Sequence, residues 1–438
     1  MRATATPASD PHRPMAAYGT PCGWNALLPA RAGTPLDADV RCDLAVVGAG
    51  YTGLAAARRW GECRSEDRVL VLEALTVGEG NPGRNSGFLL EVALAEDADP
   101  AAVGRMRSAN ALIRQTMETM LSLVGSRLGP DGLSRRGTYR AAAGPVGEAA
   151  LARYRQFLDA AGLPYAALDR DGLAARIGSR FYSEGLYSPD CYLAQPAALI
   201  RALADALPEN VVLRERSPVD RLVREGRTWV LESRGHRVRA AHVVLANNAF
   251  AKHLSRRASR VVAMYTYAGL TERLAEADRN QLGSDDQWGL LPAHRLGSTL
   301  RLTADGRLLV RALHGYEAEA DPDQVAEGLR DNLARRFPDL QVPPFVSTWG
   351  GATGYTLGGG PLWGPVGDGL WVSAGCNGGG VVKGSLFGAA LAERACGLEA
   401  PDIPGLFGAA RWLPPEPLRR FGYLLAERRQ RRQGAAER

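Results

Sequence analysis

The strongest constraint on the fold of this chain is a glycine-rich segment that joins two regular elements near residue 50. Residues 42–47 form a short apolar run, residues 48–53 read Gly-Ala-Gly-Tyr-Thr-Gly, and residues 51–61 carry apolar side chains at helical spacing. A second apolar run follows at 68–73. This order predicts a strand, a tight turn, a helix and a second strand, which together form the βαβ unit of a doubly wound sheet.

The spacing of the glycines also predicts what the turn binds. Gly48 allows the tight turn, Gly50 lets a phosphate approach the backbone, and Gly53 lets the helix pack closely on the strand. Tyr51 and Thr52 begin the helix, whose N-terminus favours negative charge. The pattern therefore predicts a dinucleotide site.

An acidic residue stands where a dinucleotide site needs one. Glu73 ends the second predicted strand, twenty residues after Gly53. A carboxylate at this point accepts hydrogen bonds from the ribose hydroxyls and repels a 2′-phosphate, so NADP is disfavoured. Ala74 is assigned to the same site. NAD and FAD both remain compatible with this motif.

Residues 81–87, Asn-Pro-Gly-Arg-Asn-Ser-Gly, are interpreted as a loop, because Gly and Pro at this density oppose regular structure. Small side chains and exposed backbone suit a flat group laid against the chain. An isoalloxazine ring meets that description, because it needs amide donors toward its polar edge and no bulky side chain over its reacting face. This segment therefore favours FAD.

The rest of the chain alternates between helical and strand-like segments, without a repeat of fixed period. The main elements predicted are helices at 101–125, 147–162 and 196–207, short strands within 211–250, a hairpin across 298–317 that turns at Ala304-Asp305-Gly306, and a second strand–glycine turn–helix unit over 369–397.

The two strand–turn–helix units lie more than 300 residues apart, yet both look like parts of one nucleotide-binding sheet. We therefore predict an α/β fold (α+β overall) in which a doubly wound FAD-binding domain is interleaved with a mixed-sheet substrate domain. The predicted parts are an N-terminal arm (1–40), the FAD-binding domain (41–95, 186–250 and 351–400), the substrate domain (96–185 and 251–350) and a basic C-terminal tail (401–438).

Composition narrows the classes of function. Apolar residues make up 45% and charged residues 23%, which is typical of a globular protein, and no apolar run reaches the roughly 18 residues of a spanning helix. The N-terminus lacks a signal-peptide pattern, so a cytoplasmic location is expected. Residues 411–438 hold eight arginines and three glutamates and so carry almost all of the net charge of +6. Neither nucleic-acid nor membrane binding is expected.

The six cysteines are scattered, with no CxxC pair and no histidine at metal-ligand spacing. The sequence therefore predicts neither a metal site nor a disulfide framework.

Three stretches together resemble the FAD-dependent amine and amino-acid oxidoreductases of the D-amino-acid oxidase (DAO) type. They are residues 43–88, 349–365 and 370–393. Trp24 in the N-terminal arm and the Gly-Arg-Asn segment look most like the branch of γ-glutamylputrescine oxidoreductases and the glycine and sarcosine oxidases. The resemblance covers about residues 20–400 and implies the flavin-binding fold with bound FAD.

The resemblance also implies a set of residues in contact with FAD. These are Gly48, Gly50, Tyr51, Thr52, Gly53, Glu73 and Ala74 at the ADP half; Gly83, Arg84, Asn85, Ser86 and Gly87 along the pyrophosphate and the ring; Val219 on the adenine side; Ala246 and Asn247 under the cofactor; and Gly375, Asn377, Gly378, Gly379 and Gly380 at the pyrimidine edge of the ring.

The chain departs from the family pattern at three points. Asn81-Pro82 replaces the usual alanine-serine pair, which leaves the path of this segment in question. Thr353 stands where members with covalent flavin carry a cysteine, so non-covalent FAD is expected. Gly379 occupies a position where several relatives carry a histidine or larger residue.

In this family a hydride passes from the carbon beside an amine to flavin N5, and the imine that results hydrolyses. The resemblance implies the same reaction here, with O2 as the expected electron acceptor. The chain has to hold the substrate amine neutral and exclude water, and needs no protein acid or base.

Candidate substrate residues come from the predicted second domain: Tyr265, Tyr267, Arg301, Arg311, His314, Trp349 and Tyr355. The two tyrosines Tyr265 and Tyr267 alternate along a predicted strand and so share one face. Either arginine is suited to clamp a carboxylate. We interpret both tyrosines as lining of the substrate pocket.

Two other functions remain open at this point. One is a flavin dehydrogenase that passes electrons to a quinone or another acceptor at a membrane surface, with the arginine-rich tail as its anchor. The other is a non-flavin NAD protein with a regulatory role. The substrate, its stereochemistry and the oligomeric state are not determined by the sequence.

Overall fold

The computed structural model describes residue 15 and residues 18–92 and 103–438, except for the side chains of residues 130 and 131.

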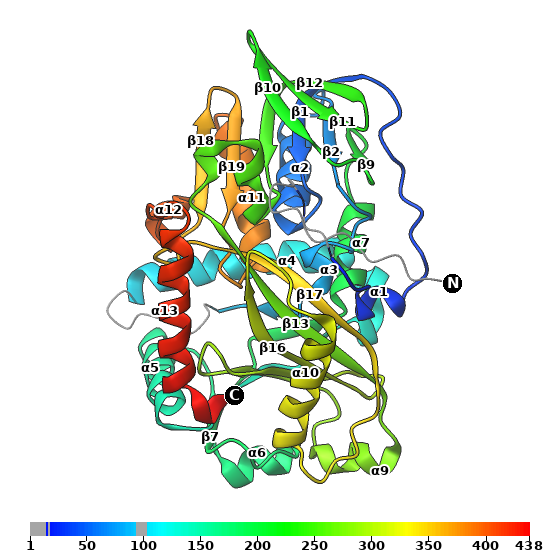
Figure 1. Cartoon of the computed structure of the whole chain (residues 1–438). Coiled ribbons are helices and arrows are strands. Elements are labelled where there is room, and N and C mark those ends of the chain that lie inside the picture. Colours follow the sequence, from blue (N-terminus) through cyan, green and yellow to red (C-terminus); the bar gives the residue numbers. More distant parts are fainter. Residues whose placement is uncertain (1–14, 16–17, 93–102) are drawn as a thin grey trace.

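The first of two large sheets contains the predicted βαβ unit. Five parallel strands form the centre of this sheet (Figure 1). In spatial order they are β9 (Val211–Arg214), β2 (Val69–Leu72), β1 (Val40–Val47), β12 (His236–Leu245) and β19 (Leu370–Ala374).

Antiparallel strands complete this first sheet on one side of β1. The hairpin of β10 (Arg221–Glu225) and β11 (Thr228–Ser233) pairs with β12, and β18 (Leu362–Gly367) pairs with β19. The predicted doubly wound sheet is confirmed, with its two strand–turn–helix units separated only by β12.

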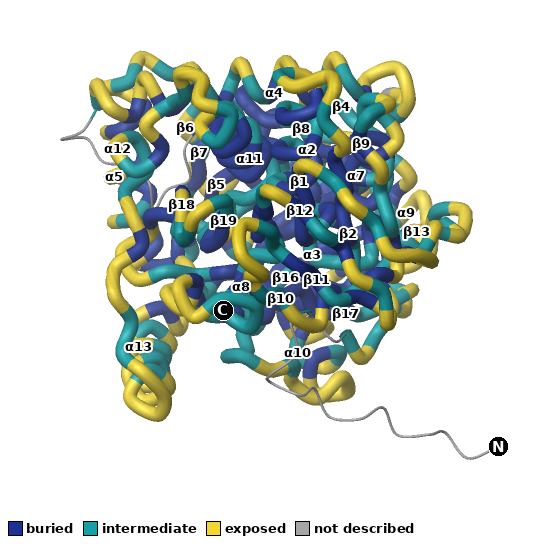
Figure 2. Tube along the Cα trace, turned by 90° about the horizontal axis from the view of Figure 1, so that it is seen from above, coloured by how far each residue is buried: buried dark blue, intermediate teal, exposed yellow. Residues whose placement is uncertain are grey.

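The second half of β1, residues 44–47, is buried on both faces, which explains why this run is continuously apolar. Leu44 and Val46 pack in the core beneath the helices, whereas Ala45 and Val47 belong to the core shared with the second sheet. The buried residues of these strands lie in the middle of the molecule (Figure 2).

Four helices pack in the core on one face of the first sheet: α2 (Tyr51–Cys63), α4 (Val103–Gly132), α7 (Pro196–Asp205) and α11 (Val382–Ala395). Helices α2 and α11 approach very closely, because a Cβ at Gly388 would lie 2.1 Å from the carbonyl oxygen of Thr52. The N-termini of both helices are thereby held side by side.

The second large sheet has eight strands and is antiparallel except where β14 pairs with β5. Helix α10 (Pro322–Arg336) packs against β16 and β13. The predicted hairpin is confirmed as β15 and β16, with Gly306 at φ +79° in its turn. In spatial order the strands are β17 (Phe345–Tyr355), β13 (Val262–Arg273), β16 (Arg307–Tyr316), β15 (Thr299–Leu302), β14 (Trp288–Pro292), β5 (Thr138–Ala142), β7 (Glu184–Ser188) and β6 (Ala166–Asp169).

The chain crosses several times between the two large sheets. Residues 186–188 lie in β7 and residues 351–355 lie in β17, so both of these expected parts of the FAD-binding domain belong to strands of the second sheet. A small third sheet joins β3 (Phe88–Leu90), β8 (Cys191–Ala194) and β4 (Leu133–Arg135).

The remaining helices are short or peripheral. They are α1 (Gly23–Ala26), α3 (Asn81–Arg84), α5 (Pro145–Ala161), α6 (Arg170–Ile177), α8 (Ala251–Leu254), α9 (Glu276–Arg279), α12 (Ile403–Phe407) and α13 (Leu418–Gln433). Among the described residues no helix has the length and apolar character needed to cross a membrane.

Candidate functional site

A cavity lies between the two large sheets and is lined by residues of both. Two helix N-termini, those of α2 and α11, contribute to its wall, and each follows a parallel strand of the first sheet. The amide groups of a helix N-terminus attract anions, so this wall suits a phosphate-containing group.

Most of the FAD contacts expected from the sequence line this cavity. They are Gly48, Gly50, Tyr51, Thr52, Glu73, Ala74, Arg84, Asn85, Ser86, Val219, Ala246, Asn247, Gly378, Gly379 and Gly380.

The first glycine turn has the geometry that its spacing predicts. Gly48 has φ +100°, a conformation that favours glycine, and Gly50 is the N-cap of α2. Gly53 does not line the cavity, because a Cβ on this residue would lie 1.9 Å from the carbonyl oxygen of Gly48. Gly53 therefore allows the close packing that shapes the turn, whereas Gly48 and Gly50 line the cavity.

The Glu73 carboxylate is held at the cavity wall by backbone amides. Its Oε2 accepts a hydrogen bond from the Ala49 amide at 2.8 Å, and its Oε1 accepts one from the Leu75 amide at 3.0 Å. Burial raises the pKa of Glu73. These amide bonds fix the orientation of the carboxylate, which fits a ribose hydroxyl pair as its partner.

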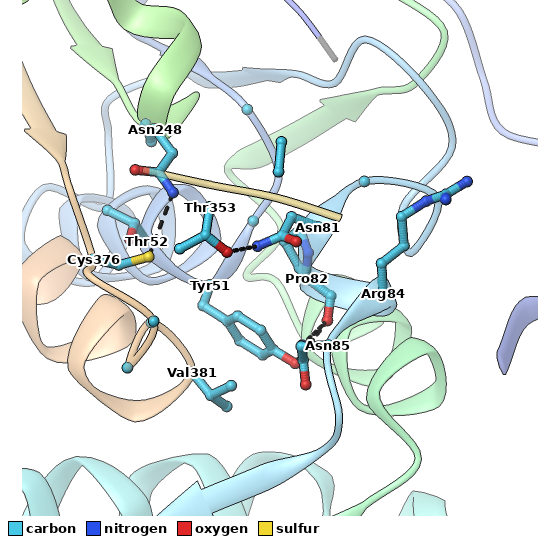
Figure 3. Close-up of a pocket in the computed structure, with 18 of the residues that line it drawn as sticks. Tyr51, Thr52, Asn81, Pro82, Arg84, Asn85, Asn248, Thr353, Cys376 and Val381 are labelled. Atoms are coloured by element: carbon cyan, nitrogen blue, oxygen red, sulfur yellow. Dashed lines mark hydrogen bonds between the residues drawn. The ribbon is translucent and has the colours of Figure 1, made fainter. Parts of the chain in front are cut away.

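The expectation that residues 81–87 lack regular structure is wrong at their start, because Asn81–Arg84 form the single helical turn α3. Pro82 is tolerated there because the first turn of a helix leaves its amides without intrahelical partners. The Pro82 carbonyl accepts hydrogen bonds from the Tyr51 hydroxyl at 3.2 Å and from the side-chain amide of Asn85 at 2.6 Å (Figure 3).

This turn also explains the Asn81-Pro82 pair. A Cβ at Gly50 would lie 3.0 Å from Cγ of Pro82, so the proline ring covers the glycine turn. Asn81 lines the cavity and donates a hydrogen bond of 3.4 Å to the Thr353 hydroxyl. The pair therefore connects the first glycine turn to β17.

The Arg84 guanidinium is bound to backbone rather than aimed at the cavity centre. It donates to the carbonyl oxygens of Glu79, Gly350 and Thr20 at 2.7, 2.9 and 2.9 Å. It also stacks on the Tyr18 ring at 3.8 Å. Figure 3 shows the side chain extending away from Tyr51 and Asn85. These bonds give the guanidinium a structural role, while Arg84 remains part of the cavity lining.

Four other expected contacts lie outside the cavity lining: Gly83, Gly87, Gly375 and Asn377. Each of the three glycines lies too close to a neighbouring group to accept a side chain, since an added Cβ would meet another atom within 2.3 Å. The Asn377 side-chain amide donates to the carbonyl oxygens of Gly359 and Gly375, at 2.8 and 2.7 Å. These residues hold the shape of the turns around the cavity.

Several lining residues were not anticipated. They include Tyr18, Asn248 and Lys383. Asn248 accepts a hydrogen bond from the Gly375 amide at 2.8 Å and donates one to Sγ of Cys376 at 3.4 Å. Burial raises the pKa of Tyr18 to about 12. The position of Asn248 directly after a strand end was the available signal, whereas nothing in the local pattern marks Tyr18.

Of the seven candidate substrate residues, only Arg311 lines the cavity. Its Nε donates a hydrogen bond of 3.0 Å to the Thr266 hydroxyl, which lies in the same wall. Thr299 and Leu291 extend this wall, so the second sheet contributes a basic group among hydroxyl and apolar side chains.

Tyr265 and Tyr267 share one face of β13 as predicted, but this is the face turned away from the cavity. Both are buried at 3% exposure in the core, while Thr266 between them lines the cavity. The Tyr267 hydroxyl accepts a hydrogen bond from the Ala320 amide at 2.6 Å. The interpretation of the tyrosines as pocket lining is wrong, because packing against the segment before α10 decides which strand face looks inward.

Arg301 and Trp349 hold the backbone near the cavity. Arg301 is buried, and its Nη1 donates to the carbonyl oxygens of Ser86 at 3.1 Å and Ala194 at 2.5 Å. Burial lowers the pKa of Arg301 to about 10. The Trp349 indole donates to the Arg84 carbonyl at 3.0 Å. Both residues fix residues 84–86 rather than contact the cavity.

His314 and Tyr355 also lie outside the lining. The pKa of His314 is lowered to about 4, mainly by burial and further by the charges of Arg311, Arg431 and Arg438. The Tyr355 hydroxyl lies 3.1 Å from where a Cβ of Gly378 would be, so it packs behind the second glycine turn.

Comparison with known proteins identifies the family. The family model for DAO, described as FAD dependent oxidoreductase, matches residues 43–394. This chain belongs to the DAO family. It is therefore an FAD-dependent oxidoreductase, and the family resemblance of the sequence is confirmed.

Curated relatives of this DAO-family chain share about a quarter of its residues. A probable oxidoreductase OrdL of Rhizobium meliloti is 26% identical over 411 residues, covering 87% of this chain and 92% of the relative. The γ-glutamylputrescine oxidoreductase of Escherichia coli is 27% identical over 365 residues, covering 82% of this chain and 84% of the relative.

Solved structures share the fold. Glycine oxidase from Geobacillus kaustophilus superposes with a TM-score of 0.71 at 23% identity, over 86% of this chain and 100% of the other. L-proline dehydrogenase from P. horikoshii gives a TM-score of 0.67 at 15% identity, over 88% and 99% of the chains.

The residues around the cavity fit FAD. The glycines at both helix N-termini leave backbone amides open to an anionic group, and Glu73 stands at the ribose-binding strand end. Thr353, which lines the cavity, offers a hydroxyl rather than a thiol. The described residues include no cluster of three His, Cys, Asp or Glu side chains suited to hold a metal ion.

Proposed function

We propose that this protein oxidises the C–N bond of a small amine or amino acid, with O2 as electron acceptor and non-covalent FAD. The observation that carries the proposal is the composition of the cavity, which joins a glycine-lined wall on the first sheet to a wall with Arg311, Thr266 and Thr299 on the second. Relatives named as γ-glutamylputrescine oxidoreductase and glycine oxidase act on amines, which supports this substrate class.

FAD, when bound, accepts a hydride from the carbon that carries the amine. The resulting imine then reacts with water to give a carbonyl compound and an amine or ammonia. The chain therefore has to bind and orient the substrate, lower the fraction of protonated amine and exclude bulk water.

Arg311 is suited to the first two tasks. The hydrogen bond from its Nε to Thr266 fixes the plane of the guanidinium, which can then bind a carboxylate through two N–H groups. Its positive charge also disfavours a second positive charge nearby, so an amine in the cavity loses its proton more readily.

Water exclusion falls to the apolar part of the lining. It is formed by Phe88, Leu90, Val92, Ile113 and Leu291. Phe88 and Leu90 lie in the small third sheet and Val92 follows it, whereas Ile113 lies in α4 and Leu291 in β14, so they surround the cavity from different directions. An apolar wall of this kind favours the neutral form of a bound amine.

Anaerobic reduction tests the proposal. The purified yellow protein is mixed with D- and L-amino acids, N-methyl amino acids and polyamine derivatives while the flavin absorbance near 450 nm is followed. We expect one class of compound to bleach the flavin within seconds to minutes. Bleaching by no amine would overturn the proposal.

The electron acceptor needs a separate measurement. With a bleaching substrate in air, hydrogen peroxide should appear in proportion to substrate consumed. Turnover only with an artificial acceptor or a quinone would instead assign the chain to the dehydrogenases. As part of the proposal we keep a cytoplasmic location, which agrees with the six unpaired cysteines in the structure.

A further inference from the structure

The most exposed large apolar side chains gather around one C-terminal helix. Trp412, Leu418 and Phe421 are 67%, 63% and 63% exposed, the three highest values for large apolar residues in the described chain, and Leu424 and Leu425 are exposed as well. All five lie on or just before α13. Helix α13 runs along the outside of the molecule in Figure 1, and its exposed positions stand out in Figure 2.

The inner face of α13 is fixed to the protein, so its outer face has a defined orientation. Tyr423 stacks on Tyr316 with ring centroids 4.7 Å apart. Further along, the Gln430 side chain lies 3.1 Å from Nε2 of His294. Just beyond the helix, a Glu437 carboxylate oxygen accepts hydrogen bonds from two backbone amides at the start of α5, each at 2.9 Å. This anchoring holds one stripe of the helix inward.

The outer face changes character along its length. Leu418, Phe421, Leu425, Arg428 and Arg432 follow each other at spacings of three and four residues, so they form one continuous stripe. The first three are apolar and the last two basic. Leu424 lies beside the apolar part of this stripe and Arg429 beside its basic part, and both are exposed.

The charge of this region is strongly one-sided. From residue 411 to the end there are eight arginines and three glutamates. All three glutamates are engaged within the structure: Glu416 accepts from Arg419 at 2.9 Å, Glu427 accepts from Arg431 at 2.7 Å, and Glu437 is buried. A partner for this face therefore has to offer negative charge next to an apolar layer.

We propose that the outer face of α13 docks on an anionic phospholipid surface. A lipid headgroup layer supplies phosphates for Arg428, Arg429 and Arg432 and, a few ångströms deeper, acyl chains for the apolar residues. A second copy of the chain would bring two arginine-rich helices together, which opposes pairing at this face. The docking is peripheral, and it goes beyond the proposed amine oxidation and does not depend on it.

Vesicle co-sedimentation tests the proposal with the full-length, FAD-loaded protein. One set of vesicles is pure phosphatidylcholine, and the other is an equimolar mixture of phosphatidylcholine and phosphatidylglycerol. We expect the protein to sediment with the anionic vesicles at low ionic strength and to stay in solution with the neutral ones. Raising the salt to about 0.5 M should release it, because screening weakens the attraction of the arginines.

Two variants separate the two parts of the stripe. In the triple variant Arg428→Gln, Arg429→Gln, Arg432→Gln, partitioning should fall roughly 100-fold, at about fivefold per arginine near the surface. In the double variant Phe421→Ser, Leu425→Ser, it should fall at least roughly tenfold through lost apolar insertion. An unchanged flavin spectrum and unchanged thermal unfolding establish that each variant is folded.

The matched control removes three exposed arginines elsewhere, with the same loss of net charge. Arg180, Arg221 and Arg273 have side chains that are 71%, 65% and 69% exposed. Their change to Gln should leave vesicle binding nearly intact. Equal loss in this control, or equal binding to neutral vesicles, would overturn the proposal. So would a dimer in light scattering that the Phe421→Ser, Leu425→Ser variant dissociates, because it would assign the face to a second copy.

Discussion

The two walls of the cavity are built in different ways. The wall on the first sheet consists largely of backbone, presented by glycine turns at the N-termini of α2 and α11. The wall on the second sheet consists of side chains that project from strands, with Thr266, Thr299 and Arg311 among them. A backbone wall recognises what all members of a family share, whereas a side-chain wall can change with the substrate.

The two walls also differ in how they tolerate substitution. In the first glycine turn an added Cβ at Gly48 or Gly53 would meet neighbouring backbone, and in the second turn a Cβ at Gly378 or Gly380 would meet packed side chains, so the geometry has little freedom. On the strands, the same backbone can carry different side chains toward the cavity. Substitutions in the two walls should therefore have different consequences.

Gly53→Val should abolish FAD binding. Its Cβ would lie 1.9 Å from the carbonyl oxygen of Gly48, so the turn and the start of α2 would have to separate. We expect the purified variant to be colourless, which absorbance near 450 nm measures directly.

The matched control is Gly125→Ala in α4, where an added Cβ meets nothing within 4 Å. This change should keep the flavin and raise the free energy of unfolding by about 0.5–1 kcal/mol, because alanine favours the helix. A yellow Gly53→Val protein with normal FAD affinity would contradict the account of the backbone wall.

Arg311→Met should raise KM for a carboxylate-bearing substrate by roughly 10- to 100-fold, because a charged hydrogen-bonded pair contributes about 1.5–3 kcal/mol. The FAD content should not change, because Arg311 lies on the opposite wall. Steady-state kinetics with the compound that bleaches the flavin give this value.

Arg301→Met is the contrasting variant on the same sheet. Its loss would leave the carbonyl oxygens of Ser86 and Ala194 without this partner. We expect the free energy of unfolding to fall by about 2–3 kcal/mol with little change in KM. A large increase in KM with unaltered stability would mean that Arg301 binds the substrate.

His314 should make the protein sensitive to mild acid. Burial and nearby arginines lower its pKa in the folded state to about 4, whereas an unfolded histidine titrates near 6.5. Between pH 6.5 and 4 the imidazole of His314 is protonated in the unfolded chain and neutral in the folded chain. The stabilisation of the folded state by the neutral imidazole is therefore present above pH 6.5 and is lost as the pH falls toward 4.

The loss attributable to His314 between pH 6.5 and 5 is about 2 kcal/mol. His314→Gln should therefore show a smaller fall in thermal stability over this interval than the unmodified protein. An identical pH dependence in the His314→Gln variant would refute this assignment.

The smallest effects should separate two neighbours on β13. Tyr267→Phe removes the acceptor of the Ala320 amide and should cost about 1 kcal/mol of stability without affecting KM. Thr266→Val removes the hydroxyl bound to Arg311 and should raise KM roughly three- to tenfold. The reverse assignment of effects would mean that the tyrosine face looks into the cavity.

The contrast between the walls also explains how far the sequence could be interpreted. The first wall is encoded locally, because a strand, a glycine turn and a helix follow one another within about 20 residues and fix their own geometry. Gly48, Gly50, Glu73 and the second glycine turn could thus be assigned in advance. The α3 turn was missed because a helix of four residues is too short for a helical period to be detected in its sequence.

The order of residues is enough to specify the dinucleotide-binding unit, the family and the alternation of Tyr265, Thr266 and Tyr267 along one strand. Which face of that strand meets the cavity depends instead on tertiary packing against a distant segment near Ala320. The same holds for Arg84 and Arg301. Most of their partners are carbonyl groups from remote parts of the chain. A local sequence pattern cannot show which remote carbonyl groups will need a hydrogen-bond donor in the folded protein.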